Sequence, residues 1–253
     1  QLNPTYGYKL LSNFADLWKA NNKFNSESIL EVAHSSNSAG NWGCIACTEG
    51  NVMGIITGPR GYTAKTAGAP DYVSGYSFLV FTPEFYNFIH YDPRNAATVA
   101  NLDSLKTNGI ADYTAGYMNT GYFLGKFIGH NADKSTGAGN YELNFPQNQY
   151  EIRLADTYLM EAEALIRGNG DLTRAAALMT AVHSRAYNDG NTHPLTATMD
   201  NLKKERRLEL AGEGHRWFDL VRWGDAPAAL GSRGFVAGIH EILPIPLNEL
   251  SNT

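Results

Sequence analysis

Acidic and basic side chains crowd the stretch ERRLELAGEGHRWFDLVRWG, residues 205–224. Glu205 and Glu209 are one helical turn apart, a spacing that could present two carboxyls to one sugar, as a retaining glycosidase does. Such an enzyme needs one acid with a raised pKa, whereas a nearby arginine such as Arg206 would lower the pKa of both. Buried ions persist when they are paired, and the planar fork of arginine can bridge two carboxylates. We therefore expect Glu205, Arg206 and Glu209 to form a structural ion network, with catalysis as the alternative.

Other catalytic signatures are not found in the sequence. There is no HExxH, no GxSxG and no Gly-rich phosphate loop between a strand and a helix, and the seven histidines are scattered. A net charge of −5 provides no basic excess to hold a phosphate backbone. No run of 18 apolar residues exists that would predict a membrane-spanning helix. We identify no catalytic residue, no cofactor, no metal site and no nucleic-acid partner.

The two cysteines, Cys44 and Cys47, form a CxxC motif in a loop rich in Gly, Asn and Ser. A redox CxxC is expected at the start of a helix in a βαβ unit, a context that is missing here. A zinc site needs about four ligands, and only His34 lies near. Free thiols, a local disulfide, a disulfide that shapes the loop and a metal site all stay open.

The elements that must position these residues are short in the first part of the chain. Apolar periodicity predicts a helix over residues 4–22, a strand over 28–34 and a short helix over 83–90. Residues 35–77 show no sustained period, and an irregular segment of this length in a compact domain is usually functional. Residues 95–147 are expected to form short strands and loops.

The last third of the chain shows clear helical periodicity. Apolar residues from Ile152 to Ile166 predict one helix, and Asp171 caps a second that runs to Ala186. Two antiparallel helices joined by a tight Gly-rich turn are typical of a tetratricopeptide-like hairpin. A third helix follows Thr198 and carries the two glutamates, and in the helix after it Trp217 is expected in the core. The fold class is mainly α, with irregular loops and a few short strands.

The run ERRLELAGEGHRWFDLVRWG resembles the C-terminal signature of the SusD/RagB family, the nutrient-binding outer-membrane lipoproteins of Bacteroidetes. Four further segments match in the same order: ESILEV (27–32), DPRN (92–95), IRLADTYLMEAEAL (152–165) and LPIPLNEL (243–250). The resemblance implies a mainly α-helical fold in which tetratricopeptide-like hairpins brace a loop-rich, ligand-binding part.

The resemblance also implies a function. It is the non-catalytic binding of an oligosaccharide or similar nutrient at the cell surface, and delivery to a SusC-like TonB-dependent outer-membrane transporter. The alternative is a glycoside hydrolase that acts through carboxylates of a loop-lined cleft. Family members are longer and carry a signal peptide, a lipobox cysteine and most helical hairpins ahead of the part matched here. Attachment to the membrane is therefore expected only through a lipid anchor outside these residues.

The expected domain organisation follows from the same resemblance. Residues 1–253 are expected to be a single SusD-like C-terminal domain, without the N-terminal helical half of the family. Residues 1–149 would form its loop-rich part, with the ligand-binding loop at 35–77, and residues 150–253 its helical part.

The loop 35–77 supplies the candidate ligand contacts. Glycan sites combine aromatic faces, which stack on sugar rings, with planar polar groups that bind the hydroxyls. The candidates are Trp42, Tyr62, Tyr72 and Tyr76 as aromatic contacts, and Asn41, Arg60 and Asp71 as polar ones. We expect Trp42 or Tyr72 to be the stacking platform. The alternative is that these rings fill the underside of the loop, because long loops need a small core of their own.

Overall fold

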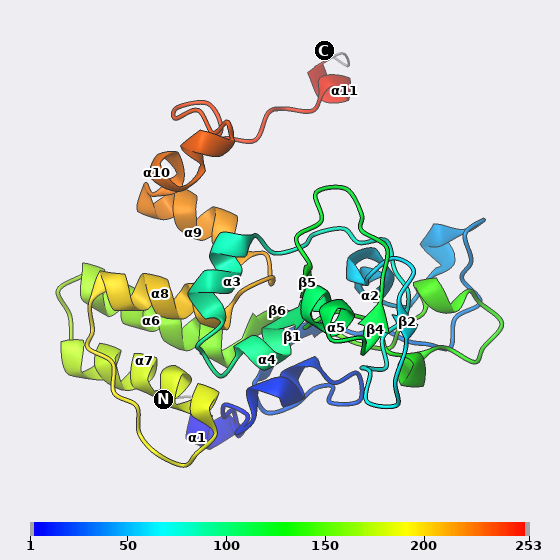
Figure 1. Ribbon diagram of the computed structural model, residues 1–253. Helices are drawn as coiled ribbons and strands as arrows, with labels where there is room; N and C mark the ends of the chain where they lie inside the picture. The colour runs from blue at the N-terminus through cyan, green and yellow to red at the C-terminus, as the bar shows by residue number, and fades with distance from the viewer. Residues whose placement is uncertain (1–2, 251–253) are drawn as a thin grey trace. The chain divides into compact units, whose positions relative to one another are not determined.

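The computed structural model describes residues 3–250 (Figure 1). The chain divides into two compact units, the larger ending at Glu209 and the smaller beginning at Leu210. Among the described residues, none of the helices combines the length and the apolar character needed to cross a bilayer. Each unit is described on its own below.

Three helices lie side by side at one end of the larger unit: α6 (Leu154–Arg167), α7 (Leu172–Tyr187) and α8 (Met199–Glu209) (Figure 1). Their contact is fully buried and includes the small residues Ala155, Ala162 and Ala175, which let the helices approach closely. Asp171 caps α7 by accepting a hydrogen bond from the Arg174 backbone N–H at 3.0 Å. The predicted antiparallel hairpin and the third helix are confirmed.

The strand β6 (Gln149–Arg153) precedes α6 and pairs antiparallel with β1 (Ser28–Val32). The predicted strand at 28–34 is therefore confirmed, but Ile152 lies in β6 and does not begin the helix. The backbone of Arg153 is extended, and the N–H of Leu154 donates to the Glu27 carbonyl at 2.9 Å. This hydrogen bond between distant segments holds the chain extended until α6 begins.

The predicted helix over residues 4–22 is wrong. The structure has a single turn, α1 (Asn3–Tyr6), and a separate 3-10 turn, η1 (Phe14–Trp18). Gly7 adopts a left-handed conformation, with a φ of 75°, and ends the first turn. Beyond it the Leu11 N–H donates to Glu27 Oε2 at 3.0 Å, so contacts with a distant carboxylate replace helical hydrogen bonds.

The other end of the larger unit is loop-rich, with short elements (Figure 1) that pack around small hydrophobic cores. A sequence-predicted helix is confirmed as α3 (Pro83–Ile89), which Thr82 caps by accepting from the Phe85 N–H. The remaining elements are η2 (Ile45–Cys47), α2 (Met53–Thr57), β2 (Thr63–Ala64), α4 (Asn95–Thr98), β3 (Val99–Asn101), α5 (Leu102–Thr107), β4 (Ala111–Asp112), β5 (Tyr122–Leu124), η3 (Asn131–Asp133) and η4 (Tyr141–Leu143). The strands pair as β1–β6, β2–β4 and β3–β5.

Two of these short helices, α4 and α5, fall where only strands and loops were expected. Asn101 explains α5, because its side chain accepts a hydrogen bond from the Ser104 N–H at 2.9 Å and starts the helix. Helices of this length are too short to show a full apolar period in sequence.

The smaller unit contains α9 (His215–Trp223), α10 (Ala226–Leu230), η5 (Gly231–Arg233) and α11 (Leu247–Leu250). Trp217 packs against Phe235 with ring centroids 5.8 Å apart, yet 39% of its surface stays exposed. The core position expected for Trp217 is therefore only partly realised.

Candidate functional site

Glu205 and Glu209 lie at the buried end of α8, surrounded by arginines. Arg94 Nη1 donates to Glu205 Oε1 at 2.7 Å and to Glu209 Oε2 at 2.9 Å. Glu209 Oε1 also accepts from Arg153 Nη1 at 2.6 Å and from Arg185 Nη2. The Glu209 side chain is 0% exposed. In the part of the chain that the structure describes, this carboxylate therefore has no surface that a substrate could contact.

The same arginines bind further carboxylates. Arg94 forms a fork with Asp92, with Nε–Oδ1 and Nη2–Oδ2 distances of 2.8 and 2.9 Å. Arg153 and Arg185 both donate to Glu27, at 3.0 and 2.6 Å from their Nη1 atoms. Lys126 Nζ joins them by donating to the Glu209 backbone carbonyl at 3.0 Å. We call this cluster the buried ion network: Glu27, Asp92, Arg94, Lys126, Arg153, Arg185, Glu205 and Glu209.

Arg206, predicted to bridge the two glutamates, has a different partner in the structure. Its Nη1 donates to Asp156 Oδ1 in α6 at 2.7 Å. The bridging group is Arg94, which comes from the turn after α3. Sequence spacing along one helix did not reveal it, because Arg94 is 111 residues away from Glu205.

The electrostatics of the buried ion network oppose acid catalysis. Burial alone would raise the pKa of Glu209, but Arg185, Arg153 and Arg94 lower it well below its ordinary value. The general acid of a glycosidase needs the opposite shift. In the larger unit these carboxylates are therefore placed to hold segments together.

The exposed aromatic residues of loop 35–77 lie outside the buried ion network and close to one another. Trp42 is 46% exposed, and its ring centroid lies 6.3 Å from that of Tyr76, which is 37% exposed. Phe78, 52% exposed, continues the row with its centroid 6.2 Å from Tyr76. We call these three residues the aromatic ridge. Sequence reasoning missed Phe78, which lies one position beyond the expected loop.

The main chain on both sides of Phe78, in the aromatic ridge, is strained. Ser77 and Leu79 both have a φ of 61°, a left-handed conformation that costs a non-glycine residue about 1–3 kcal/mol. Ser77 is held there by its N–H, which donates to the Gly58 carbonyl at 2.8 Å, and by its Oγ, which accepts from the Arg60 N–H at 2.8 Å. Such strain persists where the surroundings enforce it, and it clusters at binding and active sites.

Arg60 and Asn41 border the ridge. Arg60 Nη2 donates to the Tyr76 carbonyl at 3.3 Å, and its exposed guanidinium has further N–H groups. Asn41 precedes Trp42, and its Oδ1 accepts from the Gly43 N–H at 2.8 Å in a tight turn. The structure therefore brings four of the candidates together: Asn41, Trp42, Arg60 and Tyr76.

The other three candidates form a second group against the core. The rings of Tyr62 and Tyr72 lie 5.5 Å apart, and both pack on the core cluster around Phe123. Burial, with a smaller effect from Tyr62, raises the pKa of Tyr72 to about 12. The carboxylate of Asp71 accepts hydrogen bonds from Asn131 Nδ2 at 3.1 Å and from the Ala132 N–H at 2.9 Å. Their polar and aromatic groups are engaged within the fold.

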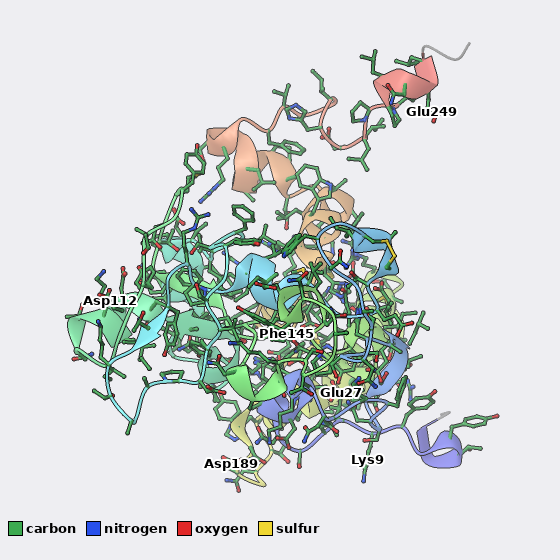
Figure 2. The ribbon with its side chains drawn as sticks, turned by 90° about the vertical axis from the view of Figure 1, so that its right-hand side faces the viewer. Lys9, Glu27, Asp112, Phe145, Asp189 and Glu249 are labelled. Carbon is green, nitrogen blue, oxygen red and sulfur yellow. A yellow bond between two sulfur atoms is a disulfide. The ribbon has the colours of Figure 1, made fainter. Side chains whose placement is uncertain are left out.

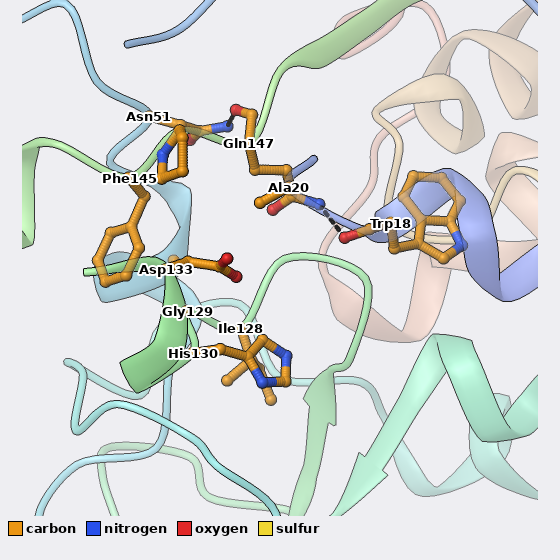
Figure 3. A pocket seen from close by; sticks show the side chains of 11 residues that line it. Trp18, Ala20, Asn51, Ile128, Gly129, His130, Asp133, Phe145 and Gln147 are labelled. Atoms are coloured by element: carbon orange, nitrogen blue, oxygen red, sulfur yellow. Dashed lines mark hydrogen bonds between the residues drawn. The ribbon is translucent and has the colours of Figure 1, made fainter. Parts of the chain in front are cut away.

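A small pocket lies near η1 and the turn after β5 (Figure 3). Gln147 Nε2 crosses one side and donates to the Trp18 carbonyl at 3.0 Å. The space accommodates about one water molecule, which is too little for a sugar ring. Its lining comprises Trp18, Ala20, Asn51, Gly54, Ile128, Gly129, His130, Asp133, Phe145, Pro146 and Gln147.

Cys44 and Cys47 form a disulfide, drawn as a yellow bond in Figure 2. Free thiols and a cysteine metal site, two of the alternatives that the sequence left open, are therefore not what the structure shows. Within residues 3–250, no group of three His, Cys, Asp or Glu side chains is placed to hold a metal ion.

Known proteins are similar to this chain in sequence. A SusD-like protein from Bacteroides ovatus is 26% identical over 219 residues, which is 86% of this chain and 38% of the relative. SusD-like protein P25 from Formosa agariphila is 28% identical over 281 residues, 96% of this chain and 50% of the relative. The chain thus spans half or less of the length of these relatives.

Solved structures of SusD-like proteins are similar to this chain in both sequence and fold. A laminarin binding SusD-like protein is 52% identical with a TM-score of 0.91, over 98% of this chain and 53% of that one. Surface glycan-binding protein A from Bacteroides thetaiotaomicron, in complex with laminarihexaose, is 28% identical with a TM-score of 0.83, over 97% and 54%. The profile of the SusD family matches residues 101–236, more than half of the chain. With the helical hairpin and the loop-rich part arranged as in these structures, this chain belongs to the SusD family.

Proposed function

We propose that this chain carries a non-catalytic glycan-binding surface centred on the aromatic ridge. The observation that supports it is a row of exposed rings, Trp42, Tyr76 and Phe78, in which the main chain beside Tyr76 and Phe78 is held in a strained conformation. Exposed aromatic faces bind the apolar side of sugar rings, and soluble domains rarely expose several together without a partner. Asn41 and Arg60 would bind sugar hydroxyls at its border.

The ligand class that we propose is a β-1,3-linked glucan. Two similar proteins are described as binding laminarin or laminarihexaose, and one of them is 52% identical to this chain. The ring planes within the ridge are tilted by 44° and 51° from one another. A glycan that stacks on successive rings must therefore bend, as a β-1,3-linked chain does and a ribbon-like β-1,4-linked chain does not.

In this proposal the second group supports the ridge. Tyr62 would brace loop 35–77 internally, because its hydroxyl donates to the Pro70 carbonyl at 2.6 Å. Asp71 and Tyr72 would hold the loop from beneath, through the hydrogen bonds of the Asp71 carboxylate to residues 131 and 132 and through packing of the Tyr72 ring on the core. The expected division into a binding part, 1–149, and a helical part, 150–253, is kept as part of the same proposal.

The delivery of the glycan and the location of the protein are proposed from its membership of the SusD family. We infer that the bound glycan passes to a SusC-like TonB-dependent transporter, and that a lipid outside these residues anchors the protein at the outer-membrane surface. The hydrolase alternative would need an accessible pair of carboxylates, whereas Glu205 and Glu209 are buried among arginines.

Trp42→Ala tests the proposed function. We expect binding of laminarihexaose, measured by calorimetry, to weaken at least tenfold, since aromatic anchors at the centre of a binding surface carry most of its energy. Tyr6→Ala, which removes an exposed ring in α1, should leave the affinity unchanged. The wild-type protein should release no reducing ends from laminarin. Unchanged affinity of Trp42→Ala would remove this residue from the site, and release of reducing ends would favour the hydrolase.

A further inference from the structure

The two ends of the loop that carries Trp42 lie side by side. Gly40 and Thr48 lie so close that a Cβ at Gly40 would sit 2.7 Å from the Thr48 Cα. The Gly40 carbonyl is fixed from below, because it accepts from Asn144 Nδ2 at 3.1 Å. We call residues 40–48 the Trp42 loop. Its base is anchored, and the rest extends outward.

The tip of the Trp42 loop has no core of its own. Residues 41–47 are all exposed or half-buried, and the apolar Ile45 is among the exposed ones. Apolar burial, which orders most long loops from inside, therefore contributes little to the placement of Trp42.

Local constraints remain at the tip: short-range hydrogen bonds and a disulfide. The N–H of Cys44 donates to the Asn41 carbonyl at 2.9 Å and closes a turn around Trp42. The N–H of Cys47 donates to the Cys44 carbonyl at 3.1 Å in η2. The disulfide between Cys44 and Cys47 joins the end of the first turn to the end of the second. Because backbone hydrogen bonds at the surface compete with water, the disulfide is the constraint that solvent does not weaken.

We propose that the Cys44–Cys47 disulfide positions Trp42 for glycan binding. This inference rests on the proposed function of the aromatic ridge and adds a positioning element to it. The disulfide fixes the Cys44 end of the turn, so the Trp42 ring is held beside Tyr76 before the glycan arrives. A reduced loop would have to be ordered on binding, and that cost lowers the affinity.

A positioning role differs from a role in global stability. A disulfide stabilises the folded state chiefly by restricting the unfolded chain, and the effect is smallest for short rings. Cys44 and Cys47 are three residues apart in the sequence. Opening this ring should therefore change the melting temperature little while it changes the affinity for the glycan.

The test compares four samples: wild type, wild type fully reduced with a phosphine and checked by thiol alkylation, Cys44→Ser/Cys47→Ser, and Trp42→Ala. Calorimetry with laminarihexaose gives the affinity, and circular dichroism gives the melting temperature. We expect the reduced protein and the double variant to bind about tenfold more weakly than the oxidised one, the effect of re-ordering one or two residues. The phosphine should not alter the affinity of the double variant.

The outcomes separate this inference from the proposed function. If Trp42→Ala loses affinity while the reduced protein and the double variant bind like wild type, the disulfide does not position Trp42, and the glycan site stands. If oxidised wild type binds neither laminarihexaose nor laminarin, the proposed function and the inference both fail. Should the double variant melt far below wild type, the disulfide is a global stabiliser, and the inference is overturned.

Discussion

Arg153 holds Glu209 by two hydrogen bonds, from Nη1 to Oε1 at 2.6 Å and from Nη2 to the backbone carbonyl at 3.0 Å. Arg153 is the last residue of β6, and Glu209 is the last of α8. The pair therefore ties the start of the helical hairpin to the end of the third helix. Because Arg153 Nη1 also donates to Glu27 at 3.0 Å, the strand β1 is tied to the same point.

Glu209→Gln should destabilise the larger unit strongly. The substitution keeps the shape of the side chain but leaves Arg94, Arg153 and Arg185 facing a neutral group in a buried site. Removing one partner of a buried ion pair typically costs about 3–5 kcal/mol. Urea denaturation followed by circular dichroism measures the free energy of unfolding.

Glu151→Gln is the matched control for Glu209→Gln, because Glu151 lies on the exposed side of β6. It should change the free energy of unfolding by less than about 0.5 kcal/mol. If Glu209→Gln were as mild as this control, the buried ion network would not be holding these segments together.

The buried ion network should also make the protein sensitive to acid. Burial opposes ionisation of Glu209 and Asp92, but their arginine partners lower the pKa of each below the ordinary values of 4.5 and 3.8. A carboxylate with a lowered folded-state pKa contributes stability that is complete above its unfolded pKa and is lost as the pH falls through the folded pKa. We expect the free energy of unfolding to stay level between neutral pH and about pH 5, and to fall below about pH 4.5.

Denaturation curves over this pH range check the expected acid sensitivity. Asp92→Asn removes one carboxyl with a lowered pKa and should make the fall of stability with pH shallower than in wild type. A wild-type protein whose stability rises as the pH drops towards 3 would contradict the assignment.

The sequence was sufficient to predict the long helices α6, α7 and α8 and an ion network at Glu205 and Glu209, but not the partners in that network. The α6–α7 hairpin shows a regular apolar period, and a helix with this pattern buries its stripe wherever it packs. The partners of Glu205 and Glu209 show no such pattern, because Arg94 and Arg153 approach from segments that only the fold brings near. A contact with a distant segment also replaces helical hydrogen bonds within the expected helix over residues 4–22, where the Leu11 N–H donates to Glu27.

The sequence predicted some of the exposed rings of the candidate site, but it did not separate them from the buried ones. Composition identified aromatic residues in an irregular segment, and Trp42 and Tyr76 are indeed exposed neighbours. Tyr72 looked equivalent in sequence but packs on His130, with centroids 5.4 Å apart. An irregular chain has no period that assigns side chains to faces, so sequence alone could not tell one tyrosine from the other.

Tyr76→Ala and Tyr72→Ala should therefore have different effects. Tyr76 lies in the aromatic ridge and is partly exposed, so its loss should weaken laminarihexaose binding about tenfold with little effect on folding. Tyr72 contacts the core, so its loss should cost on the order of 2 kcal/mol or more of stability. Calorimetry and urea denaturation of both variants measure the two effects.

Tyr76→Phe is the control that separates stacking of the Tyr76 ring on the glycan from hydrogen bonding by the Tyr76 hydroxyl. It keeps the ring and should keep most of the affinity. If Tyr72→Ala lost glycan affinity at unchanged stability while Tyr76→Ala lost none, the stacking platform would lie in the second group and not in the ridge.

Gly75→Ala should disturb stability and binding together, because Gly75 packs directly against another backbone segment. A Cβ at this position would lie 2.5 Å from the Ile55 carbonyl oxygen and 2.6 Å from the Gly58 Cα. Neither atom can rotate away, so the segment must move, at a cost of about 1–3 kcal/mol. The next residue is Tyr76, whose N–H donates to the same Ile55 carbonyl at 2.8 Å.

Movement at Gly75 should therefore displace the centre of the aromatic ridge and weaken laminarihexaose binding in calorimetry, alongside a lower free energy of unfolding. Gly68→Ala is the matched control in the same loop, since its Cβ would meet only Thr66 Oγ1, at 4.0 Å. The two variants add the same methyl group, and only one adds it against a backbone that carries the ridge. Equal affinities for both would mean that the glycan does not depend on where this backbone places Tyr76.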